Sequence, residues 1–250
     1  MLEFRHVSST VNKKKILDDI SFSVPEHKIT VILGKNGSGK STLIRCINQL
    51  QKYDGVIALN GVPLSGMNMQ EHSLHISVLP QILPQTSLSV YDLFKTGLQS
   101  KCAHSNLSKV KEKDFLERAV ITSGLADKAN QIVRTLSGGE QRLAFLKMIL
   151  SRNTPITILD EPMEALDVNV RNETAASIVR ASNEGATFIL VLHDLEEAIR
   201  LGDYFIILDK GTLGFAGSKA DCLKEKAIEK CFRVDRHPIN DDSFSSYFFL

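Results

Sequence analysis

One short segment, an apolar run that ends in a glycine-rich loop, limits most strongly what this chain can fold into. Residues 29–33 are apolar or β-branched throughout, which is the pattern of a strand buried on both faces. The run ends at Gly34, and apolar residues then recur at helical spacing from Ser41 to Leu50. A strand, a glycine turn and a helix in this order open an α/β unit, so the segment predicts an α/β fold.

The loop matches a phosphate-binding pattern. Gly34-Lys-Asn-Gly-Ser-Gly-Lys-Ser41 fits G-x-x-x-x-G-K-[ST], a match expected by chance in about one chain in a hundred of this length. Its glycines let backbone N–H groups approach a phosphate, and the helix N-terminus adds partial positive charge. Lys40 is expected to reach the β- and γ-phosphates of ATP, and the Ser41 hydroxyl to bind Mg²⁺. The predicted nucleotide-binding residues of this loop are Gly34, Lys35, Asn36, Gly37, Ser38, Gly39, Lys40, Ser41 and Thr42.

A second apolar run, residues 155–159, ends in two carboxylates, Asp160 and Glu161. Polar chemistry in open α/β sheets gathers past the carboxyl ends of the strands. Asp160 can hold Mg²⁺, usually through water, and Glu161 can polarise an attacking water as a general base. The alternative is a strand that merely ends in solubilising acids, and the phosphate loop elsewhere in the chain favours the catalytic interpretation.

Composition restricts the class of partner. The chain has 250 residues with 30 basic and 29 acidic side chains, so nothing in its net charge of +1 indicates a nucleic-acid surface or a polybasic membrane anchor. Its apolar runs are far shorter than the ~20 residues needed to span a bilayer, and no signal peptide is evident. The cysteines form no CxxC pair, which favours free thiols in a reducing compartment. His72 and His75 could bind a metal, but a solvated face is the favoured interpretation.

The rest of the chain is expected to complete a mixed α/β fold. Turn dipeptides at Asp54-Gly55 and Asn60-Gly61 flank a short strand and predict an antiparallel patch. Helical spacing dominates between residues 82 and 136. The expected strands are 2–7, 20–24, 56–59, 187–192 and the hairpin 204–208 with 212–215, followed by a helix near 219–229.

A third motif, Leu136-Ser-Gly-Gly-Glu140, begins a helix and presents Ser137 and two glycine amides at its positive end. With this motif the chain resembles the ATP-binding cassette (ABC) ATPases, whose signature is LSGGE/Q. Gln81 in Leu79-Pro-Gln81 matches the family's Q-loop, Asp167 matches its D-loop, and His193 matches its switch histidine. These motifs occur in the family's order and cover essentially the whole chain.

The resemblance implies a particular arrangement of the α/β fold. It implies a P-loop NTPase (RecA-like) core with an N-terminal antiparallel β subdomain and an inserted α-helical subdomain. The core and β subdomain would comprise residues 1–81 and 137–217, the helical subdomain 82–136, and a C-terminal helix and tail 218–250.

The resemblance also implies a head-to-tail dimer with a second copy of the chain. ATP held by Lys40 of one copy would be covered by the signature of the other. The implied covering residues are Ser137, Gly138, Gly139 and Glu140, with Asp167 nearby. Gln81 would sense the γ-phosphate and Mg²⁺, and His193 would contact the γ-phosphate and the water held by Glu161. The implied catalytic residues are Glu161, His193, Lys40 and Gln81, and the implied Mg²⁺ ligands are Ser41, Gln81 and Asp160.

The sequence departs from the family's pattern at three places. Val11 stands where an aromatic residue usually stacks on adenine. Met163-Glu164 replaces a pair of small hydroxyl residues, and the basic residue Arg142 lies one place earlier than usual in the signature helix.

By this resemblance the chain is expected to be an ATPase that energises a multi-subunit transporter from the cytoplasmic face of the cell membrane. Its partners would be separate membrane-spanning permease subunits and, indirectly, an extracytoplasmic substrate-binding protein, without nucleic acid. Residues 82–94 either line a groove for the permease or pack as ordinary helix contacts. The layout resembles the ATPases of iron–siderophore, haem and vitamin B12 importers. The alternatives are a metal-ion importer, an exporter, an ABC ATPase acting on ribosomes or DNA, and a nucleotide-binding regulator that does not hydrolyse.

Overall fold

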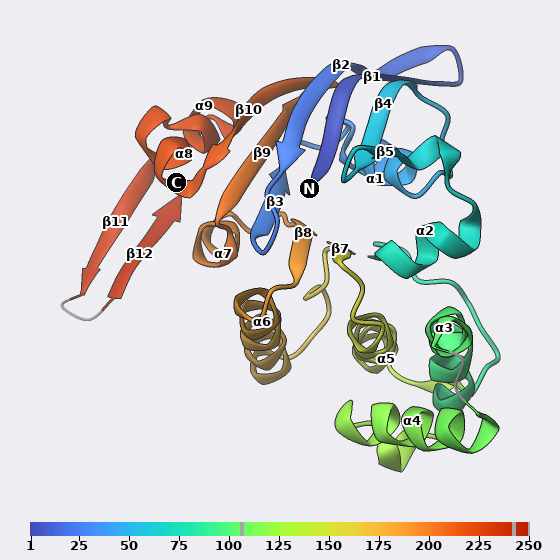
Figure 1. Cartoon of the computed structure of the whole chain (residues 1–250). Coiled ribbons are helices and arrows are strands. Elements are labelled where there is room, and N and C mark those ends of the chain that lie inside the picture. The colour runs from blue at the N-terminus through green and yellow to red at the C-terminus, as the bar shows by residue number, and fades with distance from the viewer. Residues whose placement is uncertain (106–107, 242–243, 250) are drawn as a thin grey trace. The chain divides into compact units, whose positions relative to one another are not determined.

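The computed structural model describes residues 1–105, 108–241 and 244–249, and the chain divides into two units with separate cores (Figure 1). Unit 1 comprises Met1–Met67 and Ile178–Leu250, and unit 2 comprises Asn68–Ser177. Unit 1 is therefore built from two chain segments that are separated in the sequence by the whole of unit 2.

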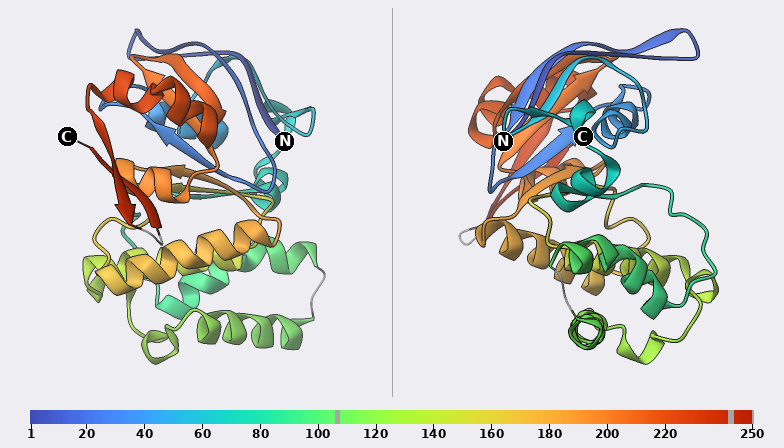
Figure 2. Two further views of the ribbon diagram at one scale, coloured as in Figure 1. Left: turned by 90° about the vertical axis from the view of Figure 1, so that its left-hand side faces the viewer. Right: turned by 45° about the vertical axis from the view of Figure 1, so that its right-hand side comes forward.

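The N-terminal part of unit 1 is an antiparallel sheet with strand order β2-β1-β4-β5. Its strands are β1 (Leu2–Val11), β2 (Lys14–Val24), β4 (Asp54–Leu59) and β5 (Val62–Pro63). The long β1–β2 hairpin is seen from two further sides in Figure 2. Asp54-Gly55, predicted as a turn, lies instead inside β4. A Cβ at Gly55 would come within 2.3 Å of the His6 carbonyl oxygen, so this glycine marks a close approach of β1 rather than a chain reversal.

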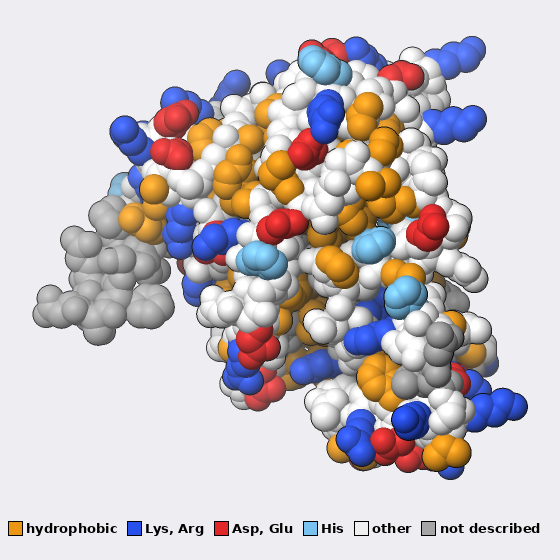
Figure 3. Space-filling view, viewed as in Figure 1, with side chains coloured by type: hydrophobic (Ala, Val, Ile, Leu, Met, Phe, Trp, Pro, Cys, Tyr) orange, Lys and Arg blue, Asp and Glu red, His pale blue; other side chains and the backbone are white. Residues whose placement is uncertain are grey.

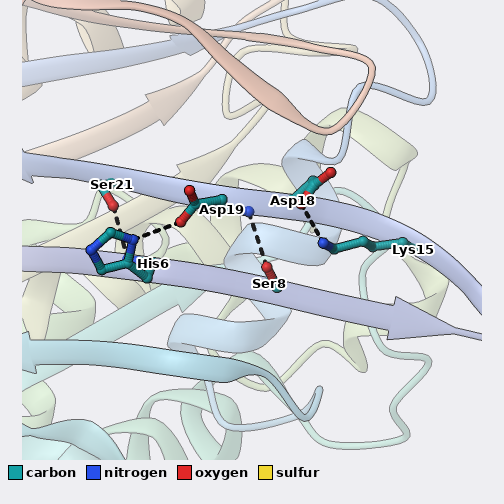
Figure 4. Close-up of polar contacts among 6 residues, drawn as sticks. All are labelled: His6, Ser8, Lys15, Asp18, Asp19 and Ser21. Atoms are coloured by element: carbon teal, nitrogen blue, oxygen red, sulfur yellow. Dashed lines mark hydrogen bonds and ion pairs between the residues drawn. The ribbon is translucent and has the colours of Figure 1, made fainter.

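Irregular positions in β1 and β2 face each other (Figure 4). His6 and Asp19 have positive φ angles of 51° and 53°, and His6 Nδ1 lies 2.7 Å from Asp19 Oδ1. Ser21 Oγ accepts a hydrogen bond from the His6 amide, and Ser8 Oγ accepts one from the Asp19 amide. The serine hydroxyls thus satisfy backbone donors that the ladder leaves unpaired at its bulges.

The second sheet of unit 1 contains the predicted buried strand. β3 (Ile29–Leu33) runs parallel to β8 (Thr187–Val191) on one side and to β9 (Tyr204–Asp209) on the other. β10 (Thr212–Ser218) pairs antiparallel with β9 at the sheet edge. β3 and β8 are buried at every position, which explains their uninterrupted apolar sequences.

Helices and a hairpin complete unit 1. The predicted helix near residues 219–229 is divided at Lys226, whose φ of 53° ends one helix and begins the next. The C-terminal hairpin was not predicted, and the Arg236 guanidinium lies over the Tyr247 ring at 4.9 Å within it. These elements are α1 (Lys40–Ile47), α7 (Leu195–Leu201), α8 (Lys219–Glu225), α9 (Ala227–Phe232), β11 (Arg236–Asp241) and β12 (Phe244–Phe249).

Unit 2 combines a parallel strand pair with helices. β6 (Ile76–Leu79) lies beside β7 (Ile156–Asp160). Neither β6 nor the helix before it was predicted. In that helix His75 is exposed, as expected of a solvated face, whereas His72 is buried, so the expectation was wrong for His72. The helices are α2 (Met69–His75), α3 (Val90–His104), α4 (Lys109–Thr122), α5 (Gly138–Ser151) and α6 (Val168–Asn183), which continues into the segment of unit 1.

The mixed charges of the surface and the free thiols agree with what the composition predicted. On the face shown in Figure 3, acidic and basic side chains are interspersed. Among the described residues, no helix combines the length and the apolar character that a membrane crossing requires. The four cysteines lie in described segments and are all free thiols, as predicted.

Candidate functional site

The predicted phosphate loop connects β3 to α1 in unit 1. A Cβ at Gly34 would lie 2.4 Å from the Leu208 carbonyl oxygen, and one at Gly39 would lie 2.6 Å from Leu17 Cδ2. Their φ angles of 153° and 105° are also unusual for residues with side chains. The loop can therefore follow this path only with glycine at these positions.

The ammonium group of Lys40 is turned toward the backbone of its own loop. Lys40 is 8% exposed, and its Nζ donates hydrogen bonds to the carbonyl oxygens of Gly34 at 2.5 Å and of Lys35 at 3.3 Å. Ser38 Oγ is buried with no hydrogen-bond partner within the described segments. Lys35, Asn36, Gly37 and Ser41 are exposed, and Thr42 is half-buried in α1. An exposed loop that leads into a helix N-terminus, beside a buried ammonium group, suits a phosphate ligand.

A turn far along the sequence supports this loop. The Gly211 amide, in the β9–β10 turn, donates to the Ser38 carbonyl at 3.1 Å. The Gly211 carbonyl accepts from the Asp18 amide of β2 at 2.8 Å. A Cβ at Gly211 would lie 2.4 Å from the Ile16 carbonyl oxygen, so only glycine fits between loop and hairpin. The sequence indicated a turn at this glycine but not its contact with the phosphate loop.

Two other predicted residues of unit 1 lie on the same framework. Val11, the position expected near adenine, is partly buried at the end of β1, opposite Lys14. His193 is exposed and lies two residues past the end of β8. Because Val191 of β8 pairs with Ile32 of β3, His193 and the phosphate loop follow the carboxyl ends of neighbouring parallel strands.

In unit 2, the structure brings together two residues predicted from separate motifs. Gln81 follows β6 and Glu161 follows β7, and the strands pair at Leu79 and Leu159. Gln81 Nε2 donates a hydrogen bond to Glu161 Oε1 at 2.9 Å. Asp160, at the end of β7, is buried with 6% of its surface exposed. Glu161 has a φ of 51°, a left-handed conformation that turns its carboxylate away from the strand direction.

A buried arginine, not predicted as a site residue, holds both strand ends. The Arg142 guanidinium in α5 donates to the carbonyl oxygens that follow β6 and to those at the end of β7. Its burial lowers the pKa of Arg142, and the negative charges of Glu164, Asp160 and Glu161 oppose that shift. The one indication in the sequence was that Arg142 lies one place earlier than the usual basic residue of the signature helix.

The signature motif caps α5. Ser137 Oγ accepts a hydrogen bond from the Glu140 amide at 3.3 Å and donates to Glu140 Oε2 at 2.8 Å, while the Ser137 amide also donates to that oxygen. Lys128 forms an ion pair with Glu140. The Lys128 hydrogen bond, followed by those from Ser137, lowers the pKa of Glu140 to about 2. Glu140 is therefore ionised at neutral pH and occupied within its own helix cap.

The signature glycines have different surroundings. Gly138 is exposed, and no described atom outside its own helix backbone and chain neighbours lies within 4 Å of a Cβ built on it. A Cβ on Gly139 would lie 2.7 Å from the carbonyl oxygen of Ala165. Asp167 is exposed two residues later and starts α6, where its carbonyl accepts from the Arg171 amide.

The chain matches known proteins along most of its length. The family described as ABC transporter matches residues 17–164. The chain is 29% identical to the iron(3+)-hydroxamate import ATP-binding protein FhuC of Bacillus subtilis (strain 168), over 90% of this chain and 85% of that protein. It is 32% identical to the hemin import ATP-binding protein HmuV of Mesorhizobium japonicum, over 93% and 91% of the two chains. Its fold resembles a solved ATP-binding subunit of an ABC transporter, with a TM-score of 0.82 and 21% identity over 93% of this chain and 98% of that chain.

Proposed function

The chain belongs to the ABC transporter family as an ATP-binding subunit, and from this premise we propose how its residues hydrolyse ATP and what the hydrolysis drives. The proposal is that Glu161 acts as the general base and that the energy released powers the import of an iron–siderophore, haem or cobalamin-like compound.

The hydrogen bond between Gln81 and Glu161 carries the catalytic part of the proposal. Glu161 Oε1 accepts from Gln81 Nε2, so the proposed base and the proposed sensor of the γ-phosphate are in direct contact. A nucleotide that draws Gln81 toward its phosphate would release Glu161 to accept a proton from water. His193, past the end of β8, would contact the γ-phosphate and hold that water.

The phosphate loop fits a nucleoside triphosphate. Lys40 would exchange the carbonyl oxygens of Gly34 and Lys35 for phosphate oxygens, which are better partners for an ammonium group. The Ser41 hydroxyl and the Gln81 and Asp160 oxygens suit Mg²⁺, which prefers hard oxygen ligands. When bound, Mg²⁺ would neutralise charge on the β- and γ-phosphates. Val11 would contact adenine through an apolar surface, without ring stacking.

The open face of the signature motif supports a dimer. Gly138 and the exposed Ser137 leave the N-terminus of α5 accessible, and that helix end attracts anions. We propose that these residues, with Gly139, Glu140 and Asp167, cover ATP held by a second copy. Separate permease subunits would attach the dimer to the cytoplasmic face of the membrane, and a substrate-binding protein would deliver the cargo to them. The cargo class rests on the names of the relatives FhuC and HmuV, which are an iron–hydroxamate and a hemin import protein.

Glu161→Gln tests the catalytic step, since it removes the base but keeps a polar side chain of the same length. We expect this variant to bind ATP, to lose at least about 100-fold in ATPase rate, and to form an ATP-dependent dimer detected by light scattering. Glu164→Gln is the matched control, because it removes one carboxylate from the same turn at an exposed position. A Glu161→Gln protein that stays monomeric in saturating ATP contradicts the proposal.

The same variant tests the transporter assignment. Tagged Glu161→Gln, expressed in the native host, should co-purify from the membrane fraction with a polytopic membrane protein, whose type would indicate the cargo. Recovery with ribosomes or nucleic acid instead would replace the transport function but leave the ATPase chemistry in place.

A further inference from the structure

We propose that Arg142 is a positioning residue that fixes the Gln81 segment and the Asp160–Glu161 segment in one geometry. The inference rests on the proposed function, because it concerns how the proposed base and sensor are held in contact. Arg142 itself touches neither a phosphate nor the attacking water in this proposal.

The contacts of Arg142 span two chain segments far apart in the sequence. Nη1 donates to the Gln81 carbonyl oxygen at 2.7 Å and to the Pro80 carbonyl oxygen at 3.3 Å. Nη2 donates to the carbonyl oxygens of Asp160 and Glu161. One planar group therefore holds the backbone after β6 with one nitrogen and the backbone at the end of β7 with the other.

This arrangement requires the shape of arginine. The guanidinium presents its donors in a fixed plane, so moving one pair of carbonyls must move the other pair. Lysine offers a single ammonium on a flexible stem, and a glutamine amide offers donors from only one nitrogen. Arg142 is 5% exposed, and burying a charge is unfavourable unless it is hydrogen-bonded. The carbonyl oxygens supply partners for Nη1 and Nη2, whereas Nε is buried with no partner within the described segments.

The backbone at Glu161 depends on such support. Its φ of 51° is unfavourable for a side chain-bearing residue, and strained positions persist when their surroundings hold them. The Nη2 hydrogen bond on the Glu161 carbonyl is one of those restraints. With both backbones held, the Gln81 and Glu161 side chains meet at 2.9 Å.

Arg152 provides a matched control at the end of the same helix. Its guanidinium is half-buried, burial lowers its pKa, and it donates to the carbonyl oxygens of Gly97 at 2.7 Å and of Ser73. These acceptors belong to α3 and α2 and not to the Gln81 or Glu161 segments. Loss of Arg152 therefore removes two hydrogen bonds of the same kind, against four for Arg142, without touching the proposed base or sensor.

The test compares Arg142→Gln, Arg142→Lys and Arg152→Gln in the full chain. We expect Arg142→Gln to lower kcat by about 10- to 100-fold with KM for ATP within about 3-fold, because misplaced groups slow the chemical step more than they weaken binding. Arg142→Lys should recover part of kcat. Both glutamine variants should lower the melting temperature, but in Arg152→Gln kcat should stay within about 2-fold of wild type. Equal losses of kcat in the Arg142→Gln and Arg152→Gln proteins would overturn the proposal, as would an unchanged kcat in Arg142→Gln.

Hydrogen exchange tests the link without using catalysis. In Arg142→Gln, amide exchange should rise together in residues 82–86 and 162–166, whereas in Arg152→Gln it should rise near residues 73 and 97 only. If the wild-type chain hydrolyses no ATP, the proposed function fails, and the exchange pattern still decides whether Arg142 joins the two segments. Unchanged exchange in both segments of Arg142→Gln refutes the link.

Discussion

Replacing Gly139 of the signature motif by a larger residue is expected to destabilise unit 2 for a steric reason. A Cβ at this position would lie 2.7 Å from the Ala165 carbonyl oxygen, whereas ordinary contacts of a Cβ begin at 3.4 Å, so one backbone must move by about 0.7 Å (3.4 − 2.7). The opposing segment has little freedom to move. Ala165 itself has a φ of 61°, and the turn around it is closed by a hydrogen bond from the Leu166 amide to the Met163 carbonyl.

The size of the effect follows from two opposing contributions. Overpacking costs about 1–3 kcal/mol in the free energy of unfolding, and a contact with backbone belongs in the upper part of that range, about 2–3 kcal/mol. Replacing glycine by alanine in a helix returns about 1 kcal/mol. Gly139→Ala is therefore expected to destabilise unit 2 by about 1–2 kcal/mol. Gly138→Ala, where no described atom lies within 4 Å of the new Cβ, should be neutral or stabilising by up to about 1 kcal/mol.

Thermal unfolding of the two variants without nucleotide, followed by circular dichroism, measures this difference. For a chain of this size about 1 kcal/mol shifts the melting temperature by about 2–4 °C, so Gly139→Ala should melt about 2–8 °C below wild type. Gly138→Ala should melt at or slightly above wild type. If Gly139→Ala is as stable as Gly138→Ala, the contact with Ala165 does not constrain the signature loop and the steric argument is wrong.

Two further predictions concern titratable groups. The pKa of Glu140 is lowered to about 2, so its contribution to stability is present above its unfolded pKa near 4.5 and is lost as the pH falls toward 2. Lys128→Met should raise this pKa and so weaken the loss of stability in acid, which urea midpoints at pH 6 and pH 3 measure. Equal pH dependence in both proteins would mean that Lys128 does not hold Glu140. Burial raises the pKa of Cys222 to about 12 from an unfolded value near 9, so stability should fall as the pH rises between these values, and less so in Cys222→Ala. Thiol titration should find Cys222 unreactive in the native chain at pH 8, and rapid reaction there would contradict its burial.

The sequence predicted the elements whose signals are local and strong. β3, β7 and β8 are uninterrupted runs with no exposed face, and the phosphate loop carries both its pattern and its glycines. β6 escaped prediction because four residues directly after a helix are too few to show a period. The break at Lys226 was also invisible, since a left-handed residue other than glycine leaves no mark in the sequence.

In the candidate site, motifs identified single residues, but the contacts between them could not be predicted from the sequence. Gln81 and Glu161 could be named from their motifs, but their hydrogen bond depends on the pairing of β6 with β7. Arg142 acts on carbonyl oxygens, which every residue possesses, so no side-chain pattern at Pro80 or Asp160 could indicate its partners. Gly211 supports the phosphate loop through a hydrogen bond from its backbone amide, and the sequence does not indicate such a backbone contact either.

The pairing of β3 with β8 and β9 has a consequence for how the protein is made. Ile29 pairs with Phe188, and Thr30 pairs with Tyr204, so the strand that leads into the phosphate loop leaves the ribosome long before either neighbour. Until then its apolar residues have no sheet to enter, and an exposed strand of this kind is prone to aggregate. Unit 2, by contrast, is encoded in one continuous stretch and can fold while the end of the chain is still being synthesised. We therefore expect nascent chains that stop before residue 187 to retain a protected unit 2 but an unformed phosphate loop, so this protein most needs a chaperone between the synthesis of β3 and the synthesis of β8 and β9.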